Sequence, residues 1–211
     1  KLCSENPDIK SIFFRKNSGK SFALSAGFMH AKGEIIITLD GDLQDRPEDI
    51  PKLIEKLNEG FDLVSGWKQD RKDSIVRRYG SFIFNVVVSR FGGVRLHDFN
   101  CGFKAYRKKV VKLIPIYGQY HRFIPLLAYR LGFRVTEVSV NNDYRKYGLS
   151  KYRTFRYQGL FDLLAVLFVH RYRFSPLYFF GLFGGFLIIP SILALGYFFI
   201  EHVLYIFNIK G

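Results

Sequence analysis

The chain contains little cysteine, and this scarcity excludes two classes of protein. Its 211 residues include only Cys3 and Cys101, too few for a disulfide framework or for a metal cluster held by cysteines. We therefore expect a reducing compartment. Hydrophobic residues make up 48% of the chain and charged residues 24%, which excludes a disordered or collagen-like chain. The length predicts one packed domain of ordinary size with an appendage.

Acidic residues are scarce in the middle of the chain. Residues 1–62 carry 9 basic and 11 acidic side chains, whereas residues 63–173 carry 22 basic and 6 acidic ones. This excess of positive charge attracts an anionic partner, which could be nucleic acid, an acidic membrane surface or a phosphorylated substrate. Charge alone does not select among the three.

Formal charge is absent from residues 174–200. A helix of that length reaches roughly 40 Å, more than the roughly 30 Å hydrocarbon core of a bilayer. The run therefore predicts a membrane span, with a buried core helix as the alternative. Arg171 and Arg173 precede it, and the positive-inside tendency places the preceding residues in the cytoplasm. No N-terminal signal peptide argues otherwise.

Hydrophobic periodicity predicts alternating strands and helices in the first third of the chain. Strands are expected at residues 9–14, 34–39 and 62–65, and helices between Lys20 and Gly33 and between Pro47 and Gly60. The apolar strand at 34–39 is typical of one buried on both faces, and Asp45 is expected to cap the second helix. This order indicates an α/β fold with a mostly parallel sheet, whose ligands bind at the carboxyl ends of the strands.

Two further segments have the pattern of amphipathic helices. Residues 74–91 carry an apolar stripe with arginines outside it, so this helix could lie on a bilayer. Residues 157–170 are interpreted as an interfacial helix, and a helix packed on the core is the alternative.

Asp40 and Asp42 follow the expected strand at 34–39, with Gln44 close behind. Two carboxylates at this spacing can share Mg²⁺ or Mn²⁺, because such ions are held by one or two carboxylates plus substrate phosphates. The pair therefore suggests a substrate that carries a diphosphate. A solvated turn is the alternative, which the position at the end of a strand makes less favourable.

Several motifs together resemble one family. They are GEIIITLDGDLQDRPE at residues 33–48, RKNSGK at 15–20, RRYGS at 77–81, HDFNCGFKAY at 97–106, HRFIP at 121–125 and YGLSK at 147–151. The combination resembles the polyprenyl-phosphate glycosyltransferases of glycosyltransferase family 2, of the dolichol-phosphate mannose synthase and bactoprenol-phosphate glucosyltransferase type.

The resemblance implies a GT-A fold with a Rossmann-like sheet and a reaction that inverts the sugar carbon. It also implies a nucleotide-sugar donor, UDP- or GDP-linked, a polyprenyl phosphate acceptor, Mg²⁺ or Mn²⁺ as cofactor, and no nucleic-acid partner. The matching positions carry these expected roles: Asp40, Asp42 and Gln44 hold the metal; Asp42 and Asp98 are catalytic; Lys68, Arg77 and Ser81 bind the acceptor phosphate; Arg145, Ser150 and Lys151 bind the donor phosphates.

Several of these residues also have a purely structural interpretation. Without the resemblance, Asp98 would be interpreted as a turn carboxylate and Ser81, Arg145 and Lys151 as solvated side chains. The positions at 100–102 are expected to shape the backbone, and His121 and Arg122 to be structural. His97 beside Asp98 suggests a dyad, but sequence neighbours seldom face each other.

The expected chemistry requires little proton transfer. A phosphate monoester has its second pKa near 6, so the acceptor is already a nucleophilic dianion at neutral pH. The protein would align that oxygen with the sugar and stabilise the departing nucleoside diphosphate.

The family pattern also sets expectations for domain organisation. We expect a partial GT-A domain at residues 1–156, a juxtamembrane amphipathic helix at 157–173 and a transmembrane segment at 174–207. The family usually starts with a strand, a Pro-x-Tyr/Asn-Glu segment and an Asp-Asp-x-Ser pair, and has at least two spans. We therefore expect these residues to be a fragment of an integral membrane protein of the cell envelope or glycan assembly.

Other functions stay open at this point. A processive polysaccharide synthase would carry a Gln-x-x-Arg-Trp motif, whereas the one tryptophan here is Trp67. A membrane-tethered protein that binds lipid or nucleic acid through its basic block is the second alternative, and an inactive partner subunit is the third. Whether the protein forms a homo-oligomer is also open.

Overall fold

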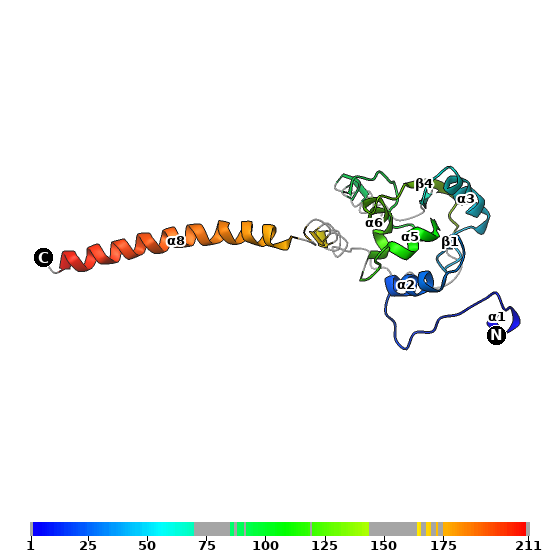
Figure 1. Cartoon of the computed structure of the whole chain (residues 1–211), viewed down its shortest axis with the longest axis horizontal. Coiled ribbons are helices and arrows are strands. Elements are labelled where there is room, and N and C mark those ends of the chain that lie inside the picture. The colour runs from blue at the N-terminus through cyan, green and yellow to red at the C-terminus, as the bar shows by residue number, and fades with distance from the viewer. Residues whose placement is uncertain are drawn as a thin grey trace. The chain divides into compact units, whose positions relative to one another are not determined.

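The structure is a computed structural model that describes residues 2–69, 85–86, 88–90, 92–118, 120–143, 164–165, 168–169, 172 and 175–209. The chain divides into two compact units, Lys1–Leu164 and Ala165–Gly211. The first contains helices and a sheet, and the second is dominated by one long helix (Figure 1).

The described part of the first unit alternates between helices and strands. In chain order its elements are α1 (Leu2–Glu5), α2 (Lys20–His30), β1 (Ile35–Thr38), the 3-10 helix η1 (Pro47–Asp49), α3 (Ile50–Asn58), β2 (Leu63–Lys68), β3 (Lys104–Arg107), α5 (Lys108–Leu113), the 3-10 helix η2 (Tyr120–Arg122), α6 (Ile124–Arg130) and β4 (Val135–Val140). The predicted α/β class, and the elements α2, β1, α3 and β2 within it, are therefore confirmed.

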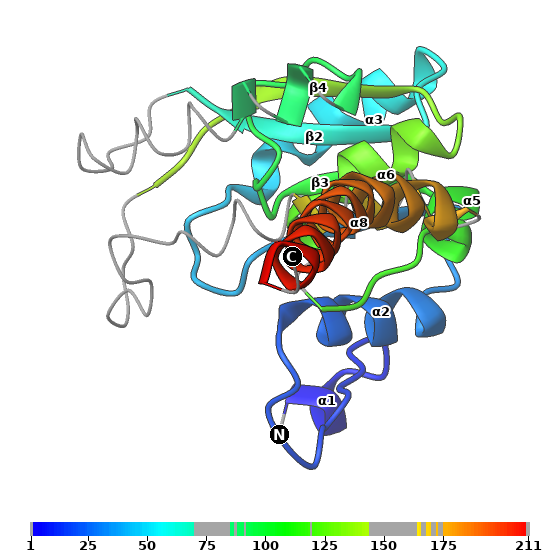
Figure 2. The ribbon, with the colours of Figure 1, turned by 90° about the vertical axis from the view of Figure 1, so that its left-hand side faces the viewer.

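The four strands form one mixed sheet in the order β1-β3-β2-β4. β3 runs antiparallel to both of its neighbours, and β2 pairs with β4 in parallel. β1, β2 and β4 thus point the same way, which agrees with the predicted mostly parallel sheet, although β4 was not among the predicted strands. β3 is an inserted strand of opposite direction that periodicity did not reveal. Figure 2 shows β2 beside β4 and β3.

Helices cover both faces of this sheet. Leu53 and Leu57 of α3 are fully buried and pack against Phe103 and Ala105. Because successive strand residues face opposite sides, Tyr106 points to the other face, where its ring lies 5.2 Å from that of Phe28 in α2. The predicted apolar stripe of α3 therefore forms the core on one face.

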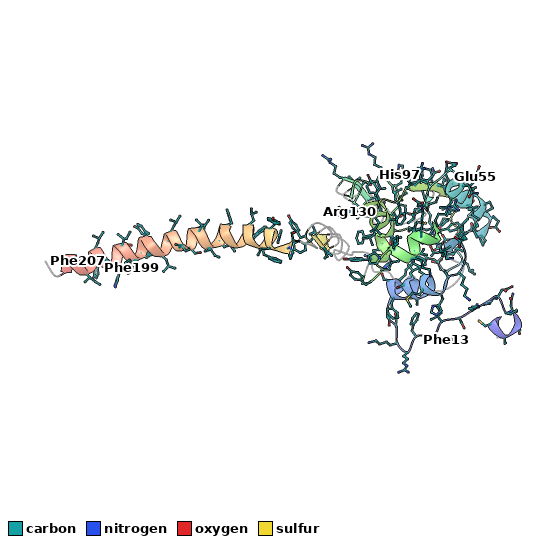
Figure 3. All side chains as sticks on the ribbon, viewed as in Figure 1. Phe13, Glu55, His97, Arg130, Phe199 and Phe207 are labelled. Carbon is teal, nitrogen blue, oxygen red and sulfur yellow. The ribbon has the colours of Figure 1, made fainter. Side chains whose placement is uncertain are left out.

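The strand predicted at residues 9–14 is wrong. This segment has no regular secondary structure and its side chains are exposed, Phe13 to 90% (Figure 3). β1 is an edge strand of the described sheet, and an extended segment forms a strand only when a neighbour pairs with its backbone. The edge position also explains why β1 is partly exposed and not buried on both faces.

Asp45 does not cap the following helix, contrary to the prediction. The residue before η1 is Arg46, and neither η1 nor α3 has a side-chain cap. The Asp45 carboxylate instead accepts a hydrogen bond from the Asp40 backbone N–H at 3.2 Å. A local capping rule could not anticipate this use of the side chain.

The second unit contains α8 (Pro176–Ile209), which is long and apolar enough to cross a membrane over Pro176–Phe207. The predicted long apolar helix is confirmed. Most of its described side chains are exposed, including Phe199 and Phe207 (Figure 3), and an exposed apolar surface of this length suits lipid. Most of the two predicted amphipathic helices, at 74–91 and 157–170, lies outside the described residues.

Candidate active site

The acidic pair, Asp40 and Asp42, follows β1 and lies close to the loop that precedes β3. Thr38, the last residue of β1, pairs with Lys104 at the start of β3. Its hydroxyl donates a hydrogen bond to the Gly102 carbonyl at 2.7 Å. The loop with Asp40 is therefore fixed against the loop that precedes β3, which contains Asp98.

Asp40 is tightly held. A Cβ atom on Gly102 would lie 2.3 Å from Asp40 Oδ2, so the carboxylate packs directly on the glycine backbone. Its other oxygen, Oδ1, lies 2.6 Å from Lys20 Nζ at the start of α2. The resemblance did not suggest a role for either Gly102 or Lys20 at this carboxylate.

Asp42 and Gln44 lie in a turn stabilised by local bonds. The Gln44 N–H donates to Asp42 Oδ1 at 3.3 Å, and Gln44 Nε2 donates to the Asp143 carbonyl at 3.2 Å. Leu43 between them has a positive φ of 59°, which is uncommon for a residue other than glycine. The backbone of this turn therefore restricts the directions in which the Asp42 and Gln44 side chains can point.

Lys68 pairs with Asp45. Its Nζ lies 2.5 Å from Asp45 Oδ1, and their side chains are 12% and 0% exposed. The lysine is thus located beside the acidic loop, while its predicted contact with an acceptor phosphate stays a prediction.

Asp98 is almost fully buried and forms a local turn. Asp98 Oδ1 accepts the Asn100 N–H at 3.1 Å, and its carbonyl accepts the Ser65 hydroxyl at 3.4 Å. Lys104 is fully buried nearby and donates to the Cys101 carbonyl. Burial lowers the pKa of the Lys104 ammonium, and Cys101, Asp98 and Asp40 oppose that shift.

The two histidines have separate surroundings. His97 pairs with Glu137 of β4 and stacks on Trp67, with ring centroids 4.1 Å apart. His121 Nδ1 lies 2.9 Å from the Ser21 hydroxyl, which links η2 to α2. Burial lowers the pKa of His121 to about 4, assisted by the charges of Arg122 and Lys20.

Five predicted site residues lie outside the described part of the chain. They are Arg77, Ser81, Arg145, Ser150 and Lys151. Their roles in binding the acceptor and donor phosphates stay predictions.

The residues present fit a divalent cation that is completed by substrate oxygens. Within the described ranges no three His, Cys, Asp or Glu side chains group closely enough to hold a metal ion by themselves. Asp40 and Asp42 supply hard carboxylate oxygens, and Gln44 supplies an amide oxygen. Such a set suits Mg²⁺ or Mn²⁺ when phosphate oxygens complete the coordination.

Comparison with solved structures identifies the fold. The chain resembles glucosyl-3-phosphoglycerate synthase from Mycobacterium tuberculosis in complex with uridine diphosphate, with a TM-score of 0.51 and 23% identity. The match covers 71% of this chain and 55% of that one. The fold is therefore that of a GT-A-like glycosyltransferase, as the sequence predicts.

Comparison of sequences identifies the family. The profile of glycosyl transferase family 2 matches residues 1–114, and the chain belongs to this family. It is 38% identical over 201 residues to dodecaprenyl-phosphate galacturonate synthase of Rhizobium johnstonii, covering 90% of this chain and 58% of that protein. It is 40% identical over 160 residues to undecaprenyl-phosphate 4-deoxy-4-formamido-L-arabinose transferase of Salmonella paratyphi B, covering 75% and 49%. The chain thus spans about half the length of these relatives.

Proposed function

We propose that the protein transfers a sugar from a nucleotide-sugar donor to polyprenyl phosphate at a membrane. The observation that carries this proposal is the Asp40 and Asp42 pair at the end of β1, with Asp40 packed on Gly102. The names of the two relatives specify a polyprenyl phosphate, and the apolar α8 supports action at a bilayer.

Asp40, Asp42 and Gln44 would hold Mg²⁺ or Mn²⁺ on the diphosphate of a UDP- or GDP-linked sugar. The ion supplies positive charge for the negative charge that develops on the leaving diphosphate. Arg145, Ser150 and Lys151 would contact the same phosphates, since cations beside developing charge stabilise the transition state.

The acceptor phosphate would be bound by Lys68, Arg77 and Ser81. As a dianion at neutral pH, it attacks the anomeric carbon without a strong general base. The new C–O bond forms as the bond to the diphosphate breaks on the opposite side, and a single displacement of this kind inverts the anomeric configuration. Asp98, on the loop attached to β1 through Gly102, would position the reacting sugar.

The catalytic unit would act at the cytoplasmic face. This orientation follows from the basic residues that precede the uncharged run. Nucleotide sugars and the phosphate end of the lipid would then meet at the bilayer surface. The product would be a polyprenyl-phosphate sugar for glycan or cell-envelope assembly.

The test is transfer of labelled sugar by membranes that contain the full-length protein. Label from UDP- or GDP-sugars should enter the lipid fraction only when polyprenyl phosphate and Mg²⁺ or Mn²⁺ are present. Asp42→Asn should abolish incorporation, while Glu55→Gln on the outer face of α3 should not change it. Transfer without a divalent cation, or unchanged transfer by the Asp42→Asn variant, would contradict the mechanism. No incorporation by the unmodified protein would favour a binding protein or an inactive subunit.

A further inference from the structure

Lys20 and a divalent cation would compete for the same carboxylate. Lys20 Nζ lies 2.6 Å from Asp40 Oδ1, and Asp40 is one of the residues that would hold the metal. An ammonium ion at this distance neutralises the carboxylate and repels a second cation. The bond between Lys20 and Asp40 must therefore weaken when a metal ion binds.

Lys20 is suited to leave, whereas Lys104, which also interacts with Asp40, is not. The side chains of Lys20 and Asp40 are each 34% exposed, and ion pairs with such access to water are weak. Lysine also carries its charge on a flexible stem with four carbons. Lys104, by contrast, is fully buried and donates to the Cys101 carbonyl, so its ammonium is fixed.

The charge balance indicates where Lys20 would go. Without metal, its single positive charge partly neutralises the two carboxylates of Asp40 and Asp42. A divalent cation would neutralise both, and the ammonium would then be in excess. A nucleoside diphosphate brings negative oxygens to the same place, and charge-assisted hydrogen bonds to phosphate are strong.

We propose that Lys20 is an exchangeable counter-ion of Asp40, which leaves this carboxylate when a divalent cation binds and then contacts the diphosphate of the nucleotide. The inference rests on the proposed function, because it takes from it the cation and the nucleoside diphosphate. It adds a donor-binding residue from α2, outside the acidic loop.

The experiment measures two affinities of the full-length protein in detergent. Mn²⁺ binding without nucleotide is followed by electron paramagnetic resonance, and UDP and GDP binding at saturating Mn²⁺ is followed by calorimetry. Lys20→Met should bind Mn²⁺ about two- to fivefold more tightly, because a weak competing ion pair is gone. The same variant should bind the nucleotide roughly tenfold more weakly, because it lacks a charged donor.

Opposite shifts in the two affinities distinguish exchange from a structural role. Loss of a structural role would weaken the binding of both Mn²⁺ and nucleotide, or of neither. Lys56→Met is the matched control, since it removes one positive charge from a partly exposed pair, with Glu59, and should change neither affinity. Lys20→Arg keeps the charge and should restore nucleotide binding. If Lys20→Met does not fold, Lys20→Gln serves as the uncharged variant with the same two expected shifts.

Failure of this inference is separable from failure of the proposed function. Unchanged or weaker Mn²⁺ binding in the uncharged variants would overturn the exchange, even if sugar transfer is observed. So would unchanged nucleotide binding. If no nucleotide binds to the unmodified protein, the proposed function is contradicted and so is the second half of the exchange.

Discussion

Gly102 shows how a single residue without a side chain can determine the position of a functional group. Its Cα lies so close to the Asp40 carboxylate that an added Cβ would be 2.3 Å from Oδ2 and 2.5 Å from Cγ. Because Asp40 has a short side chain, the carboxylate cannot accommodate a methyl group without moving. The close approach of the Asp40 loop to the segment before β3 therefore depends on Gly102.

We predict that Gly102→Ala weakens Mn²⁺ binding by about tenfold or more, because displacement of Asp40 costs at least one ligand. The protein should still fold, since the residue lies in the loop before β3 and not within a strand. Electron paramagnetic resonance of Mn²⁺ measures the change. Gly27→Ala is the control, because nothing lies within 4 Å of the added carbon in α2. Equal Mn²⁺ affinity in the two variants would show that Asp40 is not fixed by Gly102.

His121 makes stability depend on pH. Burial lowers its pKa to about 4 from an ordinary 6.5, so between these values the unfolded chain binds a proton that the folded protein does not. Stability should therefore fall as the pH decreases from 6.5 towards 4. Burial raises the pKa of Asp49 and Asp62, but pairing with Lys52 and Lys109 lowers each below its usual value. The stability that these two ion pairs contribute is thus lost only at a pH below the ordinary pKa of an aspartate.

The measurement is the melting temperature of the full-length protein at pH 7 and pH 5. We expect a smaller decrease for His121→Asn than for the unmodified chain, because asparagine cannot take up the proton. His30→Gln, which changes an exposed histidine, should behave as the unmodified chain does. If His121→Asn loses as much on acidification, His121 is not the responsible group.

At the scale of the elements, α3 is the best example of structure that follows from local pattern. Its apolar residues recur at helical spacing, and Leu53 and Leu57 are both fully buried against the sheet. Glu55 between them is exposed and points away from the core (Figure 3). A repeating pattern on one helix does not need information from distant residues, which is why this helix could be predicted.

We predict that Leu53→Ala lowers the free energy of unfolding of the first unit by about 2–5 kcal/mol, the usual cost of a cavity in a packed core. Hydrogen exchange of the β2 and β3 amides measures the local free energy. Glu55→Ala should stay within about 0.5 kcal/mol of the unmodified chain. Equal effects of the two substitutions would contradict the packing of α3 on the sheet.

What the sequence could not reveal depends on long-range pairing. β3 contains only four residues and includes Lys104 at a buried position, so its pattern is not that of a central strand. Residues 9–14 have the composition of a strand but no pairing partner in the described sheet.

In the site, Asp40 and Asp42 were found from local spacing, and Asp98 through resemblance to the family. The partners Lys20 and Lys68 lie 20 and 23 residues from the carboxylates that they neutralise, Asp40 and Asp45, at a separation that no motif encodes.

At the scale of the whole molecule, the chain combines a catalytic fold with a helix suited to a bilayer. The two cysteines can report on the orientation of the first unit, because Cys3 is exposed and Cys101 is buried. A reagent that cannot cross membranes should therefore reach one thiol and not the other.

We predict that a membrane-impermeant maleimide labels the 211-residue chain in inverted vesicles and not in intact cells. The proposed positive-inside topology would place the first unit on the cytoplasmic side, where Cys3 is exposed and Cys101 is buried. Detergent permeabilisation of the cells should restore labelling of the unmodified chain, and Cys3→Ser should abolish labelling in inverted vesicles and in permeabilised cells. Labelling of intact cells would reverse the proposed orientation.

The stacking of Trp67 on His97 has a practical consequence. The chain holds one tryptophan, and it precedes Lys68, whose ammonium contacts the acidic loop through Asp45. The intrinsic fluorescence of this single indole originates beside the site and changes when the indole separates from the imidazole. A ligand that changes this stacking would therefore alter the fluorescence of the 211-residue chain without any attached dye.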